Sequence, residues 1–167
     1  NFSTSGASDA SGVTVAKLNQ VVDWTTADDE VLAIEKRNLE LHCGLDKDLT
    51  QLTWEFTLRP AEGKDSVELW GRHYFGLGMR FVESMDQGGE FFNSTNEKPT
   101  GVRGTEQLIR APWCAFTAKV AEKKVTVAMF DDPQNPRHPA TWFTMNGPFA
   151  YLAATLDLDR EKLAVSR

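Results

Sequence analysis

The chain has 167 residues, of which 41% are hydrophobic and 25% charged, and its formal net charge at pH 7 is −6. This composition is typical of a soluble globular protein with one hydrophobic core, and the acidic balance argues against nucleic acid as the main partner, because phosphate binding needs a concentrated positive field. No apolar run approaches the roughly 18–20 residues of a membrane helix, so the sequence also predicts no membrane partner.

The first twelve residues, NFSTSGASDASG, are small and polar, which predicts a flexible amino-terminal segment over 1–12. They lack the charged and apolar regions of a secretory signal peptide, so a removed signal peptide and a ragged fragment end both stay open. Residues 13–167 are predicted to form a single domain, for which incompleteness at both ends stays open. The compartment is open as well, with export favoured over the cytoplasm.

The next segments alternate between apolar and polar residues with the period of a β-strand. In residues 51–59, QLTWEFTLR, large apolar residues alternate with polar ones, which predicts a half-buried strand with Trp54 in the core. Residues 13–24 and 31–42 are predicted to be two further strands, and polar turns separate the three segments. The sequence therefore predicts a three-strand antiparallel meander.

Residues 66–74 are predicted to form a strand, and Gly71, Gly76 and Gly78 interrupt the run around and after it. Glycines within a strand pattern indicate a bulge or the close approach of a neighbouring group or a ligand. Residues 86–107 show little periodicity and are predicted to form a long polar loop, a feature that often carries function.

Strands return in the second half of the chain, where the sequence predicts them over residues 111–120, 125–130, 141–145 and 150–156. The final residues, LDLDREKLAVSR, still alternate, so Asp157 and Asp159 are predicted to lie on a solvated strand face rather than in a calcium site. Because this pattern stops without a closing turn, it indicates a missing carboxyl segment or an edge strand. A homo-oligomer or a partner chain that completes the sheet therefore stays open.

Short strands separated by turns rich in glycine, proline and aspartate predict an all-β fold, an antiparallel β-sandwich. Cys43 and Cys114 lie beside strand-like segments and are predicted to be buried thiols, although a disulfide stays open for an exported protein. His42, His73 and His138 are far apart in the sequence and lack metal-ligand spacing, so neither a metal nor another cofactor is predicted.

The stretch FDDPQNPRHP, residues 130–139, holds the strongest candidate for a functional site. Pro136 and Pro139 stiffen the backbone, which would aim the neighbouring side chains at a ligand at little entropic cost. Arg137 is suited to hold a carboxylate or sugar hydroxyl groups, and His138 to act as an acid, a base or a metal ligand. The alternative is a structural turn in which Arg137 pairs with a neighbouring aspartate and His138 bonds to the backbone.

A second candidate stretch, RHYFGLGMRFVE, supplies His73, Arg80 and Glu83. A glutamate–histidine pair would suit proton transfer at a sugar carbon or an anomeric centre, whereas an ordinary ion pair is the alternative for Glu83. Trp70 and Trp142 are predicted to be aromatic platforms, because an aromatic ring stacks on the apolar face of a pyranose.

The segment VAMFDDPQNPRHPATWF resembles the signature of the PmoA-like family, also called DUF6807. The segments VVDWTTADDEVLAIEKRNLEL, GLGMRFVESM and RAPWCAFTA are similar to other parts of that family and occur in the same order. The chain departs from the family pattern at Asp132 and Phe143, where histidines are usual, and it lacks the family's histidine-rich amino-terminal motif. The resemblance implies the carboxyl-side portion of the family domain, a β-sandwich of the sugar-mutarotase type and a role in bacterial carbohydrate utilisation.

The residues and the resemblance together lead to the hypothesis of a carbohydrate-active protein, a hydrolase, a lyase or an epimerase-type enzyme that acts on a small-molecule or oligosaccharide ligand. Its expected catalytic residues are His138, Arg137, Arg80 and Glu83. Its expected substrate-binding residues are His73, Trp70, Trp142 and Asn135. The alternative is a non-catalytic carbohydrate-binding or assembly module, which the short chain and the missing histidine-rich motif favour.

Overall fold

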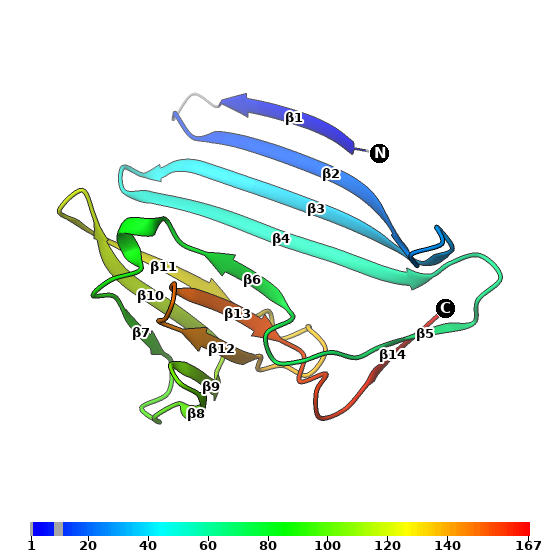
Figure 1. Cartoon of the computed structure of the whole chain (residues 1–167). Helices are drawn as coiled ribbons and strands as arrows, with labels where there is room; N and C mark the ends of the chain where they lie inside the picture. The colour runs from blue at the N-terminus through cyan, green and yellow to red at the C-terminus, as the bar shows by residue number, and fades with distance from the viewer. Residues whose placement is uncertain (1, 9–11) are drawn as a thin grey trace. The chain divides into compact units, whose positions relative to one another are not determined.

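The computed structural model describes residues 2–8 and 12–167, and the fold is all-β with antiparallel strand pairing (Figure 1). Within these residues no helix is long and apolar enough to cross a membrane. The chain divides into two compact units, Asn1–Leu69 with Leu163–Arg167 and Trp70–Lys162. The sheets of the two units share no strand over the described residues.

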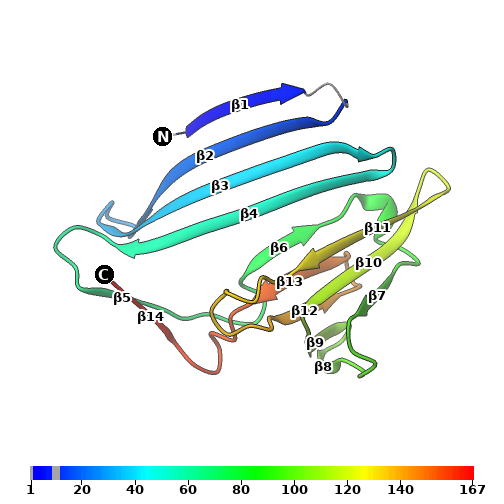
Figure 2. The ribbon, with the colours of Figure 1, turned by 180° about the vertical axis from the view of Figure 1, so that it is seen from behind.

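The first unit contains a sheet of long strands in the order β1-β2-β3-β4, here called the long sheet, in which consecutive strands lie side by side (Figure 1, Figure 2). Its strands are β1 (Phe2–Ser8), β2 (Thr14–Thr25), β3 (Val31–Asp46) and β4 (Leu49–Pro60). The antiparallel pairing of β2, β3 and β4 confirms the predicted meander. Strand β1 lies where the sequence predicted a flexible segment, because its backbone pairs with β2 although its side chains are all exposed.

The long sheet carries an apolar face, on which Trp54 of β4 lies opposite Leu39 of β3 and Leu52 lies opposite Leu41. Trp54 remains 37% exposed and Leu52 50% exposed. These exposures correct the expectation that Trp54 is a core residue. The physical reason is that alternation determines the face on which a side chain lies, and does not determine what covers that face.

A two-stranded ribbon completes the first unit, in which β5 (Ser66–Leu69) pairs with β14 (Leu163–Ser166). Strand β5 is shorter than the strand predicted for residues 66–74, because the chain turns at residues 73 and 74. Leu69 and Leu163, which flank the second unit in the sequence, are paired with each other in this ribbon.

The second unit is a β-sandwich of two antiparallel sheets. The larger, here called the central sheet, has the strand order β6-β13-β12-β9-β8, and the smaller has the order β11-β10-β7. The central sheet contains β6 (Leu77–Arg80), β8 (Thr100–Arg103), β9 (Glu106–Arg110), β12 (Thr141–Met145) and β13 (Tyr151–Thr155). The smaller sheet contains β7 (Glu90–Asn93), β10 (Trp113–Val120) and β11 (Lys123–Phe130). Strands β10 to β13 confirm the four strands predicted for the second half of the chain.

Residues 86–107 contain β7, β8 and the start of β9 in place of the predicted long loop, and a 3-10 helix, η1 (Glu83–Met85), precedes them. Strand β7 pairs with β10, which places Phe91 opposite Phe116. These strands are four or five residues long. So short an element shows too few alternations for the sequence pattern to reveal it.

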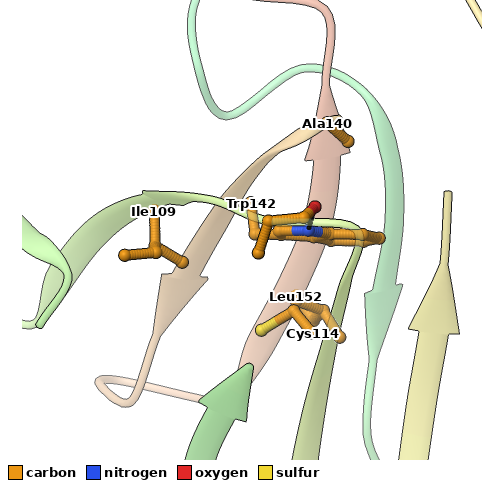
Figure 3. Close-up of a cluster of buried hydrophobic side chains, with 6 residues drawn as sticks. Ile109, Cys114, Ala140, Trp142 and Leu152 are labelled. Carbon is orange, nitrogen blue, oxygen red and sulfur yellow. Dashed lines mark hydrogen bonds between the residues drawn. The ribbon is translucent and has the colours of Figure 1, made fainter. Parts of the chain in front are cut away.

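The core of the sandwich lies between its two sheets, and Trp142 of β12 is its largest fully buried side chain. Figure 3 shows the indole of Trp142 beside Leu152 of β13 and Cys114 of β10. Trp142 is 1% exposed, and its Nε1 donates a hydrogen bond of 2.6 Å to the carbonyl oxygen of Ala111. Both cysteines are free, and burial raises the pKa of the Cys114 thiol to about 12.

Two glycines permit close approaches between β6 and β13. A Cβ atom at Gly76 would overlap the carbonyl oxygen of Ala154, and one at Gly78 would overlap the hydroxyl oxygen of Tyr151. This confirms the close approach predicted for this glycine-rich stretch and identifies the neighbouring groups. The missing side chain at Gly78 therefore provides the space in which the Tyr151 ring lies.

Candidate functional site

The proline-rich loop between β11 and β12 is organised around the carboxylate of Asp131. His138 Nδ1 lies 2.7 Å from Asp131 Oδ2. The backbone N–H of Ala140 donates to the same oxygen at 2.8 Å, and the side-chain amide of Asn135 donates to Oδ1 at 2.8 Å. His138 therefore bonds to a carboxylate rather than to the backbone, and Nε2 is the ring nitrogen left for a ligand or a proton.

Arg110 of β9 holds the same loop through its backbone. Its Nε donates to the carbonyl oxygen of Pro139 at 3.0 Å, and its Nη2 donates to those of Arg137 and His138 at 3.1 and 3.3 Å. The loop is thus fixed from two sides, by Asp131 within it and by Arg110 beneath it. This rigidity is what the closely spaced prolines predicted.

Arg137 itself points to a different part of the unit. Its backbone has a φ of 64°, which is uncommon for a residue other than glycine. The guanidinium donates hydrogen bonds to the carbonyl oxygens of Leu156, Glu161 and Lys162. Arg137 therefore contacts the backbone of this segment rather than a neighbouring aspartate, as the structural alternative proposed, and both terminal nitrogens of its guanidinium donate to it.

The segment that Arg137 binds carries two aspartates. The hydroxyl of Thr141 donates to Asp157 Oδ2 at 2.6 Å, and Asp157 has a left-handed backbone with a φ of 52°. Asp157 and Asp159 do not lie on a strand face, which corrects the prediction, because β13 ends at Thr155 and β14 begins at Leu163. The intervening residues form a turn whose two carboxylates are directed by tertiary contacts.

His73 lies against the face of the central sheet that carries Phe143, here called the Phe143 face; the two ring centroids are 5.1 Å apart. Its Nε2 is 3.9 Å from Glu106 Oε2, and its Nδ1 is 3.9 Å from Asp159 Oδ2. Both separations are too long for hydrogen bonds. Each ring nitrogen therefore faces a carboxylate without making a short hydrogen bond to it, within the described part of the chain.

A pair of tyrosines stands beside this histidine on the Phe143 face. Tyr74 and Tyr151 are stacked, with ring centroids 4.8 Å apart and planes 14° from parallel, and both meet Phe143 edge-on. Burial raises the pKa of Tyr151, and the neighbouring Tyr74 adds to that rise. Tyr74 is 39% exposed, so part of its surface is open to a ligand beside His73.

Arg80 also belongs to the Phe143 face, because it lies opposite Tyr151 in the pairing of β6 with β13. Its guanidinium carbon is 3.8 Å from the ring centroid of Phe149, a cation–π contact. The structure thus brings two predicted residues, His73 and Arg80, to one sheet face. Glu83 lies beyond that strand, exposed in the first turn of η1.

The remaining predicted residues divide between the core, the loop and the surface. Trp142 is buried in the core and is therefore unable to stack on a sugar, which corrects its assignment as a platform. Asn135 uses its amide to bind Asp131 within the loop. Trp70 is 74% exposed and keeps a free ring surface at the start of the second unit.

Three groups of this face were not predicted from the sequence: Glu106, Asp159 and Tyr151. Glu106 lay within the predicted polar loop. In β9, EQLIR, it lies on the same strand face as Leu108, but a strand of five residues is too short for this alternation to be recognised in the sequence. The aspartate lay in an apparent strand, and the tyrosine in a predicted strand without a functional signal. Within residues 2–8 and 12–167, no three histidine, cysteine, aspartate or glutamate side chains are arranged to hold a metal ion.

Comparison with known proteins gives one match. The chain matches the family described as "Family of unknown function (DUF6807)" over residues 3–164. No curated protein and no solved structure matches it. The matched range includes the long sheet except for Phe2, the proline-rich loop and the Phe143 face. Because the match covers nearly the whole sequence, the chain belongs to the DUF6807 family.

Proposed function

We propose that the protein is carbohydrate-active and that its ligand binds on the Phe143 face beside His73. One observation carries this proposal: an imidazole without a short hydrogen bond lies between two carboxylates and next to a stacked, partly exposed tyrosine pair. A pyranose presents an apolar face to an aromatic ring and hydroxyl groups to polar side chains, so the two kinds of group on this face suit the two sides of a sugar.

The chemistry that suits this arrangement is proton transfer at an anomeric centre. Neutral His73 takes the proton of the anomeric hydroxyl, and Glu106 and Asp159 stabilise the imidazolium that forms. The bond between the anomeric carbon and the ring oxygen breaks, its electron pair goes to the ring oxygen, and water supplies the proton that this oxygen takes up. Closure on the other face of the carbonyl reverses these transfers: the attacking hydroxyl gives its proton back to the hydroxide, and the His73 imidazolium returns its proton to the carbonyl oxygen. The two anomers are thereby exchanged, an epimerase-type reaction.

His138 is a second candidate for proton transfer, because its short bond to Asp131 leaves Nε2 as the reactive nitrogen. The non-catalytic alternative, a sugar-binding module, is favoured by the two 3.9 Å separations, since no short bond orients the His73 ring. These alternatives make different predictions for the two histidines.

The deciding experiment measures anomer exchange of D-glucose, D-galactose and D-xylose by NMR exchange spectroscopy, together with sugar binding by titration. We expect His73→Gln to lower the exchange rate about 10²–10⁴-fold, the range of a lost general base, with little change in sugar affinity. His42→Gln is the matched control, because His42 lies in the long sheet and bonds to Glu40.

Loss of exchange in His138→Gln but not in His73→Gln would transfer the catalytic role to the proline-rich loop. Binding without exchange in the wild type would support the sugar-binding module instead. If the wild type neither binds nor exchanges any of these sugars, the proposed function is wrong.

A further inference from the structure

We infer that Arg137 is a positioning residue, which holds the turn before β14 so that Asp159 stands opposite His73. The inference rests on the proposed function only in treating His73 as part of a sugar site. The contacts of Arg137 and Asp159 do not depend on that function. Arg137 was expected to touch a ligand, and the geometry gives it a different partner, the backbone of this turn.

The guanidinium of Arg137 joins the two ends of that turn. Nη1 donates to the carbonyl oxygen of Leu156 and, at 2.9 Å, to that of Glu161; Nη2 donates at 3.0 Å to that of Lys162. A planar guanidinium offers several donors in fixed directions, whereas a lysine ammonium is a single point on a flexible stem. Lysine at position 137 would keep the charge and lose this multiple attachment.

The other hydrogen bonds described for the turn centre on Asp157. The turn lies between β13 and β14, outside any strand ladder. Within it, the backbone N–H groups of Arg160 and Glu161 donate to the carbonyl oxygen of Asp157 at 3.0 and 3.2 Å. The bond from Thr141 and a bond of 3.3 Å from the backbone N–H of Asp157 to the hydroxyl oxygen of Thr155 hold Asp157 near the start of the turn. The Glu161 carboxylate is 3.8 Å from Arg137 but its side chain is 84% exposed, so this ion pair contributes little.

Asp159 links the position of this turn to the candidate site at His73. It lies between the attached carbonyls in sequence, and its carboxylate is 3.9 Å from His73 Nδ1. Its side chain is 31% exposed, so its own packing does not fix its direction. The distance from carboxylate to imidazole therefore depends on where the backbone of the turn lies, and Arg137 determines that.

The first test measures the turn itself, by hydrogen exchange with mass spectrometry on the whole chain. In Arg137→Lys we expect amides of residues 158–162 to exchange at least about tenfold faster, while those of β12 and β13 keep the wild-type rate. Arg160→Lys is the matched control, because it makes the same arginine-to-lysine substitution within the turn, where the backbone N–H of Arg160 donates to Asp157. Equal exchange in Arg137→Lys and the wild type would overturn the inference, and so would faster exchange throughout the sandwich, which would indicate a general loss of stability.

The second test measures the effect at His73, through its imidazole resonances in NMR spectra recorded without sugar. Arg137→Lys and Asp159→Asn are expected to shift these resonances, and the double variant is expected to shift them no further than Asp159→Asn alone, because both changes act through one carboxylate. Additive shifts, or resonances unmoved in Arg137→Lys, would contradict the positioning role.

The third test applies the same three variants to D-glucose exchange and binding. Arg137→Lys and Asp159→Asn should lower the exchange rate by similar factors, without additivity in the double variant. If the wild type shows no sugar activity, the proposed function fails. The amide hydrogen exchange and the His73 resonances still decide the role of Arg137.

Discussion

The long sheet and the sandwich are built from strands with the same alternation of apolar and polar residues, yet they bury their apolar side chains to different extents. Phe56 of the long sheet is 48% exposed, whereas Phe116 and Trp142 of the sandwich are both 1% exposed. In the sandwich, two sheets of one unit enclose the core between them. The comparison teaches that alternation creates an apolar face, and that only a second layer converts this face into a core.

The two regions also differ in how they treat a buried polar group. In the long sheet, Glu35 is 3% exposed, and its carboxylate accepts hydrogen bonds from the indole of Trp24 and the guanidinium of Arg37. In the sandwich, the indole of Trp142 donates to a backbone carbonyl. The buried carboxylate of the long sheet is thus satisfied by side chains, whereas the buried indole of the sandwich is satisfied by the backbone.

The largest difference in the cost of a substitution to stability is expected between Trp142 of the sandwich and Trp54 of the long sheet. Trp142→Ala should lower the free energy of unfolding by about 3–5 kcal/mol, because it empties a core position, while Trp54→Ala should cost less than about 2 kcal/mol, because that ring is partly exposed already. Urea unfolding followed by far-UV circular dichroism measures both. Trp142→Phe replaces the alanine variant if that variant does not fold. Equal losses of unfolding free energy at the two positions would contradict the difference in burial between the two regions.

A smaller effect is expected where the central sheet has no room for a methyl group. Gly78→Ala should destabilise the protein by about 1–3 kcal/mol, since the new Cβ displaces the Tyr151 ring. Gly101→Ala in β8 is the matched control, because a Cβ there meets nothing within 4 Å. The same unfolding measurement compares them, and a neutral Gly78→Ala would show that the tyrosine pair is not held against β6.

The network of the long sheet predicts a dependence on pH. Burial acts to raise the pKa of Glu35, but hydrogen bonds from Arg37 and Trp24 outweigh it, and the pKa is lowered from its ordinary 4.5. A lowered pKa means stability that is present above pH 4.5 and is lost as the pH falls through the folded value. Glu35→Gln should cost about 1.5 kcal/mol at pH 7 and should remove that loss. The Trp24 indole N–H resonance reports the change, and an identical acid response in the variant would disprove it.

The last expected difference concerns the chemical reactivity of the two cysteines. Burial and the resulting pKa of about 12 keep Cys114 from forming a thiolate at pH 8, whereas Cys43 is only half-buried. Iodoacetamide should therefore modify Cys43 in the folded protein and Cys114 only after denaturant is added, as mass spectrometry of the peptides will show. Equal rates of modification at the two thiols would mean that the sandwich core opens as readily as the long sheet.

Much of the fold was predictable because period-two alternation is a local property of the chain. Residues 51–59 and 141–145 were recognised as strands, and β4 and β12 confirm them. The strands within residues 86–107 were not predicted, since an element of four residues offers too few alternations. The burial of Trp54 was predicted wrongly, because the same pattern occurs whether or not a second layer covers the strand.

The candidate site was predictable only in part, for a related reason. The glycines near Tyr74 and the prolines around His138 are local signals of close approach and stiffness, and both appear in the structure. That His73 lies near Glu106 and Asp159 is a contact between three distant parts of the sequence, and no local pattern encodes it. Arg137 had the right chemistry for a ligand, but the turn after β13 occupies its donors.

The amino-acid sequence by itself therefore determined that the chain forms antiparallel strands, where most of them run, and that it belongs to the DUF6807 family. These properties follow from side-chain alternation, turn residues and motifs, which act over a few neighbouring positions. Only the tertiary structure decided which faces are covered and which distant side chains meet. Those outcomes depend on the packing of one sheet against another and on backbone carbonyls left free at strand ends, and both arise only when the whole chain has folded.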